Sequence, residues 1–181
     1  MLVLLVLVSC TGNGSAEQQS SQGAQSAQSS QGAQEGAQSN QGTWGNAPDF
    51  VVQDESGKAV ALSSFAGKPI VINFWATWSG YCKLEMPDFD LAYKEYPDVV
   101  FLMVNATDGV YETKERADAY IAAEGFSFDV YYDVASTAQM AYKISGYPTT
   151  VFIDANGDVV AKEVGAISYD TLVQGIKLIG E

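Results

Sequence analysis

The stretch Pro69–Ala76, with the sequence PIVINFWA, is the feature of this chain that most restricts its fold. A nearly continuous apolar run of this length is typical of a β-strand that is buried on both faces. Such a strand needs other elements above and below it to keep water away. The run therefore predicts the centre of an α/β sheet with helices on both faces.

The rest of the globular region alternates between strand and helix patterns. A second apolar run, VVFLMVNA, predicts another buried strand at residues 99–106. Serine residues at 136 and 168 are in place to cap two of the helices, and Pro87 should kink another. Asn156–Gly157 is a strong turn signal between two strands. Helices are predicted at 79–96, 111–125, 136–144 and 168–180, and hairpins at 50–62 and 149–165.

Charge and composition exclude several classes of function. The chain of 181 residues has 9 basic and 22 acidic residues, for a formal net charge of −13. This balance disfavours binding to nucleic acid or to anionic lipid surfaces. The sequence has no histidine, which excludes histidine-based catalysis and histidine-ligated zinc. With only two cysteines, a four-cysteine metal site is also excluded, and we expect no metal and no cofactor.

The N-terminal region has three compositional zones. Residues 1–9 are almost wholly apolar but too short to span a bilayer, which takes roughly 20 residues. They resemble the end of a secretion signal, and LVSC at 7–10 resembles a bacterial lipobox, in which the cysteine carries a lipid. We therefore expect lipidation at Cys10, a flexible Gln/Ser/Gly/Ala-rich tether over residues 10–43, and a globular domain at 44–181. This layout predicts an extracytoplasmic protein that is anchored to the cell membrane.

The segment FWATWSGYCKLEMPDF, residues 74–89, resembles the active-site region of thioredoxin-like proteins. It is most similar to the TlpA/ResA group of exported thiol–disulfide oxidoreductases. The segments at 47–78 and 146–160 resemble the same group, so the similarity extends over residues 44–181. The resemblance implies an α/β, thioredoxin-like fold, with a central mixed sheet flanked by helices and an N-terminal β-hairpin.

One departure from the family pattern concerns the chemistry itself. The family motif is Cys-x-x-Cys, and here Ser79 stands at the position of the first, nucleophilic cysteine, whereas Cys82 stands at the position of the resolving cysteine. A helix N-terminus lowers the pKa of a thiol that lies there, but a serine hydroxyl forms no disulfide. Ser79 is either an introduced replacement for cysteine or a native feature of a redox-silent relative. The intact surroundings favour the first interpretation.

The resemblance also assigns roles to other residues. It implies proton transfer by Glu85, three residues after Cys82, and the place of the buried aspartate of cytoplasmic thioredoxins is taken by Asn73. A half-buried carboxylate with a raised pKa could accept the proton of the resolving thiol.

Substrate binding is expected around the same motif. The resemblance implies a cis peptide bond before Pro148, next to the active-site turn, and backbone hydrogen bonds from Tyr147 to a bound peptide. The full set of residues expected to bind substrate is Trp78, Gly80, Tyr81, Tyr147 and Pro148.

Three functions remain open at this point. The first is a membrane-tethered monomer that reduces disulfides of exported proteins and receives electrons from a membrane partner. The second is a peroxiredoxin-like peroxidase that uses Cys82, although Trp75 occupies the proline position of that family's motif and its arginine would have to be Arg116. The third is a redox-silent module that binds peptides, which a native Ser79 would favour.

Overall fold

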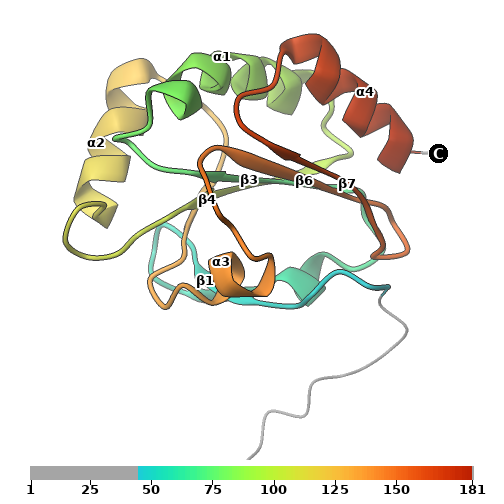
Figure 1. Ribbon diagram of the computed structural model, residues 1–181, viewed down its shortest axis with the longest axis horizontal. Coiled ribbons are helices and arrows are strands. Elements are labelled where there is room, and N and C mark those ends of the chain that lie inside the picture. Colours follow the sequence, from blue (N-terminus) through green and yellow to red (C-terminus); the bar gives the residue numbers. More distant parts are fainter. Residues whose placement is uncertain (1–44, 181) are drawn as a thin grey trace, which may run out of the picture. The chain divides into compact units, whose positions relative to one another are not determined.

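The computed structural model describes residues 45–180 (Figure 1). The predicted signal and lipobox segment at 1–9 and the predicted tether at 10–43, with Cys10, lie outside the described residues. None of the helices at 45–180 combines the length and the hydrophobicity that crossing a bilayer requires.

A mixed sheet of seven strands forms the middle layer of the described region. The strands are β1 (Val51–Gln53), β2 (Ala59–Ala61), β3 (Ile70–Trp75), β4 (Val100–Asn105), β5 (Val130–Tyr132), β6 (Thr149–Ile153) and β7 (Val159–Val164). Their order across the sheet is β2-β1-β5-β4-β3-β6-β7. β3 pairs in parallel with β4 and antiparallel with β6, so it has a neighbour on each side.

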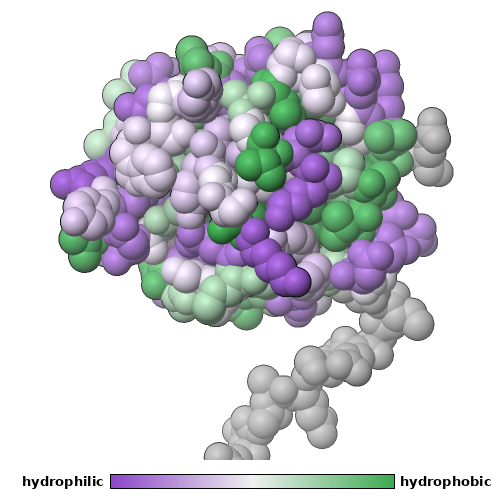
Figure 2. Space-filling model, in the orientation of Figure 1, coloured by the Kyte–Doolittle hydropathy of each residue, from purple (hydrophilic) through white to green (hydrophobic). Residues whose placement is uncertain are grey.

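Helices cover both faces of this sheet. They are α1 (Gly80–Glu95), α2 (Lys114–Glu124), α3 (Thr137–Ala141) and α4 (Tyr169–Ile179), with a short 3-10 helix η1 (Leu62–Phe65). Figure 1 shows α1, α2 and α4 on one side of the sheet and α3 on the other. The predicted α/β sheet with helices on both faces is thus confirmed. On the surface shown in Figure 2, patches of hydrophobic residues are separated by hydrophilic ones.

The side chains of β3 alternate between two cores, as a strand buried on both faces requires. Val71 and Trp75 pack on the α1 side, whereas Ile70, Ile72 and Phe74 pack on the α3 side, and all five are 0% exposed. The prediction of a strand buried on both faces is therefore confirmed. The remaining strand position on the α1 side is polar, because it is occupied by the buried Asn73.

The helix predicted at 136–144 is shorter and is capped differently from our expectation. α3 ends at Ala141, and the side chain of Ser136, with φ at 55°, makes no capping hydrogen bond. The buried carboxylate of Asp133 caps the helix instead of Ser136. It accepts hydrogen bonds from the backbone N–H groups of Ala138 (3.2 Å) and Gln139 (2.9 Å). A carboxylate at the end of β5 thus satisfies the unpaired N–H groups of the first turn. By contrast, Ser168 caps α4 as predicted.

The close contact between α4 and β6 gives a test of the packing. A Cβ atom added to Gly175 would lie 2.2 Å from the ring of Phe152, so the side chains cannot both fit without a shift. We expect Gly175→Ala to lower the free energy of unfolding by about 1–3 kcal/mol through overpacking. Gly80→Ala is the matched control, because that Cβ would meet no atom within 4 Å. Urea denaturation of both variants measures the difference, and equal midpoints would contradict the packing.

Candidate active site

The turn between β3 and α1 places Ser79 at the N-cap of the helix. Its backbone is extended (φ −84°, ψ 111°), and its hydroxyl oxygen accepts a hydrogen bond from the backbone N–H of Cys82 at 3.3 Å. The Ser79 N–H donates to the carbonyl of Ala76 at 3.2 Å, which closes the turn. The end of a helix where N–H groups are unpaired carries a partial positive charge. An anionic sulfur at this position would therefore be stabilised.

The loop before β6 lies against this turn. The Tyr147–Pro148 peptide bond is cis. The hydroxyl of Ser79 donates to the carbonyl oxygen of Tyr147 at 3.3 Å, across 68 positions of the sequence. The rings of Trp78 and Tyr147 pack edge to face with centroids 5.5 Å apart. The structure thus brings together two segments that the sequence analysis assigned to one site.

The outer rim of the site is aromatic and open to solvent. Trp78 is 60% exposed and Tyr81 is 65% exposed, and both are large hydrophobic side chains. Gly80, between them in the chain, has open space where a Cβ would be. Trp75, by contrast, is fully buried in the core. Trp78, Gly80 and Tyr81 thus form the solvent-exposed surface next to Ser79.

Cys82 lies behind Ser79 and is the free cysteine of residues 45–180. It is 0% exposed. Burial raises the pKa of the Cys82 thiol, and the negative charges of Glu85 and Glu112 raise it too, although hydrogen bonds with Ser79 and Ala76 oppose this. A thiol in this state is a poor nucleophile toward reagents in solution, because only the thiolate attacks.

Glu85 lies one helical turn beyond Cys82 and is only 2% exposed. One of its carboxylate oxygens accepts from the side-chain amide of Asn73 at 2.7 Å, and the other accepts from the backbone N–H of Ile167 at 2.9 Å. Burial raises the pKa of Glu85 to about 7, even though these two hydrogen bonds favour the charged form. A carboxyl group with such a pKa can take up and release a proton near neutral pH.

Asn73 links Glu85 to the sheet. Its amide nitrogen also donates to the hydroxyl of Thr150 at 3.1 Å, whereas its amide oxygen is buried without a partner. If the amide turned over, that oxygen would face Glu85 and could accept a hydrogen bond from its protonated form. The Asn73 amide can therefore donate a hydrogen bond to the ionised form of Glu85 or, after turning over, accept one from the protonated form. An ionised aspartate, which cytoplasmic thioredoxins are expected to have at this place, could only accept.

A second buried carboxylate, Glu112, was missed by the sequence analysis. It lies in the loop between β4 and α2 and is 0% exposed. Its oxygens accept hydrogen bonds from Thr77, inside the active-site turn, and from Asn105 at the end of β4. We predicted a helix at 111–125, which would include Glu112, but α2 begins only at Lys114 because Thr113 is its N-cap. As a helical glutamate Glu112 was expected to be solvated, so the sequence carried no signal for this contact.

Arg116, which the peroxidase alternative would require near Cys82, makes its hydrogen bonds to the loop before α2. Its guanidinium donates to the backbone carbonyls of Val110 and Tyr111. It lines a cavity of about 400 Å³ together with Trp78, Asp108 and Tyr111. No group of three or more acidic, cysteine or histidine side chains within residues 45–180 is arranged to hold a metal ion.

Together, the capped helix start, the buried cysteine behind it and the facing cis-proline loop form one cluster at the end of β3. The chain belongs to the AhpC/TSA family, whose sequence pattern matches residues 45–162. It is 33% identical over 134 residues to the thiol-disulfide oxidoreductase ResA of Bacillus subtilis, covering 74% of each chain. It is 35% identical over 131 residues to ResA of Oceanobacillus iheyensis, covering 70% of this chain and 67% of that protein.

Solved structures show the same fold. The exposed lipoprotein thioredoxin Etrx1 of Streptococcus pneumoniae superposes with a TM-score of 0.64 at 28% identity, covering 72% of this chain and 98% of Etrx1. A thiol:disulfide interchange protein of the thioredoxin family from Chlorobium tepidum gives 0.64 at 26% identity, covering 74% and 94%. The thioredoxin-like fold and the family predicted from the sequence are therefore confirmed, and the chain belongs to a family with thiol–disulfide oxidoreductase function.

The raised pKa of Glu85 gives a prediction for stability. Because the pKa is about 7 in the folded chain against 4.5 ordinarily, the folded state holds this proton more tightly than the unfolded state. The resulting stabilisation is complete below pH 4.5 and is lost as the pH rises through 7. Glu85→Gln removes this titration.

We therefore expect the unfolding free energy of the unmodified chain to fall by about 3 kcal/mol, relative to that of Glu85→Gln, between pH 4.5 and pH 8. Urea denaturation of both proteins at a series of pH values measures the difference. Parallel stability curves would show that Glu85 has an ordinary pKa.

Proposed function

We propose that this chain has the architecture of an extracytoplasmic, membrane-tethered thiol–disulfide oxidoreductase whose catalytic cycle is blocked by Ser79. The observation that carries the proposal is the position of the Ser79 hydroxyl. It lies at the start of α1, 3.3 Å from the Cys82 backbone nitrogen and 3.3 Å from the Tyr147 carbonyl oxygen. A sulfur in that place would be next to both its resolving partner and the peptide-binding loop.

The reaction needs a sulfur at position 79. Its thiolate attacks a substrate disulfide, forms a mixed disulfide and releases one substrate thiolate. The Cys82 thiol then loses its proton and attacks the sulfur at position 79, which releases the second substrate thiolate. Two electrons have passed to the substrate, and a disulfide joins positions 79 and 82. The hydroxyl of Ser79 can perform neither step.

Glu85 is the acceptor for the Cys82 proton in this scheme. The thiol is buried, so water cannot readily take the proton, and Glu85 lies on the same face of α1 with a pKa of about 7. A carboxylate whose pKa is close to the working pH is well matched to proton transfer.

The substrates are polypeptides with disulfide bonds. The backbone of Tyr147, beside Pro148, offers hydrogen bonds to an extended segment, and the exposed rim of Trp78, Gly80 and Tyr81 supplies apolar contact. We propose that the protein works as a monomer in the reducing direction. Because thiols outside the cytoplasm tend toward oxidation, a membrane protein must return two electrons after each cycle.

The anchor is the lipid on Cys10, followed by the tether at 10–43 and the domain at 44–181. Two features support this layout: the lipobox-like LVSC segment, and the solved relative Etrx1, which is described as an exposed lipoprotein. The lipid and tether would keep the redox domain within reach of a donor in the membrane.

The other two functions receive less support. A peroxidase needs an accessible, low-pKa thiolate, but Cys82 is fully buried and its pKa is raised by burial. A redox-silent peptide-binding module remains the outcome that follows if sulfur at position 79 fails to restore exchange.

The main test restores the missing sulfur. We expect Ser79→Cys to catalyse reduction of insulin by dithiothreitol at least about tenfold faster than dithiothreitol alone, because the thiolate is then formed at the helix N-terminus. Turbidity of the precipitating insulin B chain measures the rate. The unmodified chain should stay at the background rate.

Ser79→Ala is the matched control, since it changes the same position without adding a sulfur. Adding Cys82→Ala to Ser79→Cys should make mixed disulfides with the substrate accumulate, which mass spectrometry under non-reducing conditions detects. Background activity of a folded Ser79→Cys protein would rule out the oxidoreductase and favour the peptide-binding module.

The lipid anchor can be tested separately in a bacterial host. We expect the chain, expressed with a complete secretion signal, to sediment with membranes and Cys10→Ala to appear in the soluble extracytoplasmic fraction, because the substitution removes the acylated sulfur. Immunoblots of the two fractions measure the distribution, and Ser9→Ala serves as control. Membrane association of Cys10→Ala equal to that of the control would refute lipidation.

A further inference from the structure

The loop between β4 and α2 is connected to the active-site turn through a buried carboxylate. Both oxygens of Glu112 lie 3.0 Å from the backbone nitrogen of Thr77, which donates to them. One oxygen also accepts from the Thr77 hydroxyl at 2.7 Å, and the other accepts from the side-chain amide of Asn105 at 2.7 Å. Every polar contact of this carboxylate is therefore with a donor.

The charge of Glu112 has no basic partner. The ion pairs of residues 45–180 are Lys94–Asp90 and Lys114–Asp118, and neither involves Glu112. The side chain is 0% exposed. A buried carboxylate without a counter-ion is expensive and depends on its hydrogen bonds. A position of this kind needs an explanation beyond loop closure, because a neutral side chain would close the loop at lower cost.

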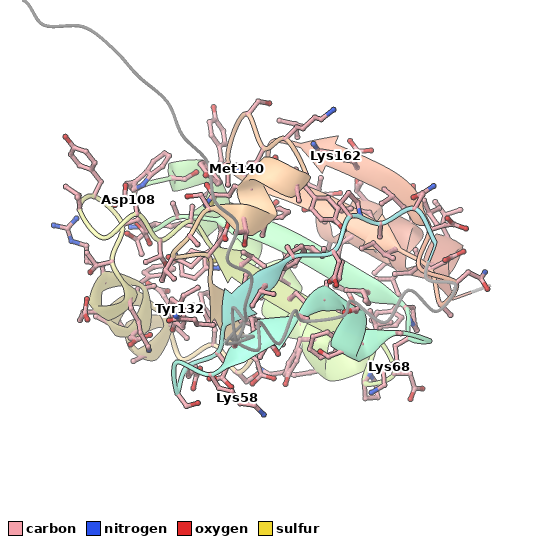
Figure 3. The ribbon with its side chains drawn as sticks, turned by 90° about the horizontal axis from the view of Figure 1, so that it is seen from below. Lys58, Lys68, Asp108, Tyr132, Met140 and Lys162 are labelled. Carbon is pink, nitrogen blue, oxygen red and sulfur yellow. The ribbon has the colours of Figure 1, made fainter. Side chains whose placement is uncertain are left out.

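The loop itself is held rigidly. One oxygen of Asp108 accepts from the backbone N–H groups of Val110 (2.7 Å), Tyr111 (2.7 Å) and Glu112 (3.0 Å). The N–H groups of Asp108 and Gly109 in turn donate to the Glu112 carbonyl at 2.9 and 3.0 Å. Figure 3 shows this loop, labelled at Asp108, at one edge of the molecule. Hydrogen bonds within the loop thus hold the backbone of Glu112 in addition to the contact of its side chain with Thr77.

We propose that Glu112 is a positioning residue of the active site. By holding Thr77, it fixes the turn that carries Trp78 and position 79, and its negative charge acts on the sulfur chemistry of the site. This inference rests on the proposed function for its role in the redox cycle, but the contact with Thr77 stands without it.

The charge acts on a thiol that several other groups face. Cys82 interacts electrostatically with Glu85 on α1, Tyr120 on α2 and Tyr147 in the cis-proline loop, in addition to Glu112. Of these, Tyr147 also contacts the turn that precedes α1, through Ser79 and Trp78, whereas Glu112 is the one that holds the backbone of Thr77 inside that turn. A change at Glu112 therefore affects both the geometry of the turn and the ease of forming the thiolate.

Two substitutions separate these effects. Glu112→Ala removes the contact and the charge. Glu112→Gln removes only the charge, because the amide oxygen can still accept from Thr77 N–H and Asn105, while the amide NH₂ can donate to the Thr77 hydroxyl. Asp90→Asn is the matched control. Asp90 is a buried carboxylate that accepts from Ser127 and Lys94, on α1 but away from the turn.

The first measurements use the full chain with Ser79 in place and Cys10→Ser, so that Cys82 is the only thiol. We expect Glu112→Ala to speed hydrogen exchange of the Thr77 amide by at least about tenfold, and Glu112→Gln to restore most of the protection. We expect alkylation of Cys82 by iodoacetamide at pH 8 to rise at least about twofold in Glu112→Gln, because the thiolate forms more easily.

The second measurement adds Ser79→Cys. The reduction potential of the 79–82 disulfide should become less negative in Glu112→Gln, because loss of a nearby negative charge favours the reduced, thiolate-bearing form. Asp90→Asn should change none of the three readouts. The same changes in Asp90→Asn would show general loosening and overturn the proposal.

The proposal is also wrong if Thr77 exchange is unchanged in a folded Glu112→Ala protein. If Glu112→Ala does not fold, Glu112→Gln decides: unchanged Cys82 alkylation together with an unchanged potential overturns the proposal. Failure of the proposed function gives a different pattern. In that case Ser79→Cys shows no insulin reduction, yet Thr77 exchange and Cys82 alkylation still respond to Glu112.

Discussion

The position of β3 between β4 and β6 is the constraint on which the rest of the site depends. Its parallel pairing with β4 places the turn after Trp75 beside the loop after Asn105, and the Ala106 N–H donates to the Trp75 carbonyl at 2.9 Å. Its antiparallel pairing with β6 places Pro148, just before that strand, on the other side of the same turn. The start of α1, the cis-proline loop and the loop that contains Glu112 therefore all lie at the C-terminal end of β3.

Two buried carboxyl groups flank this strand end, and their surroundings differ. Glu85 has two hydrogen-bond donors, and its burial raises its pKa to about 7. Glu112 accepts from the backbone N–H and the hydroxyl of Thr77 and from the side-chain amide of Asn105. The hydrogen bonds of Glu85 connect α1 to β3 and to the loop before α4, whereas those of Glu112 hold the turn between β3 and α1. Within residues 45–180, neither carboxylate has a basic partner.

Local sequence patterns were sufficient to predict the central strand, one hairpin turn and the helix start at the candidate site. The apolar run at Pro69–Ala76 and the turn at Asn156–Gly157 have one dominant structural solution each, and family resemblance placed Ser79 and Cys82 at a helix start. One contact that could not be predicted depends on strand register. Glu112 contacts Thr77 only because β3 and β4 pair as they do, and no spacing within the sequence encodes that contact. The cap of α3 was missed for a local reason: Asp133 lies only five residues before Ala138, but Ser136 stands at the helix start itself and is a preferred N-cap residue.

The hydroxyl of Ser79 accepts from the Cys82 backbone at the start of α1 and donates to the Tyr147 carbonyl before β6. One small side chain therefore joins two segments that are 68 positions apart in the sequence. As a consequence, the distance between the helix start and the cis-proline loop depends on the length and polarity of a single side chain, so that any substitution at position 79 alters the spacing of the two segments as well as the chemistry between them.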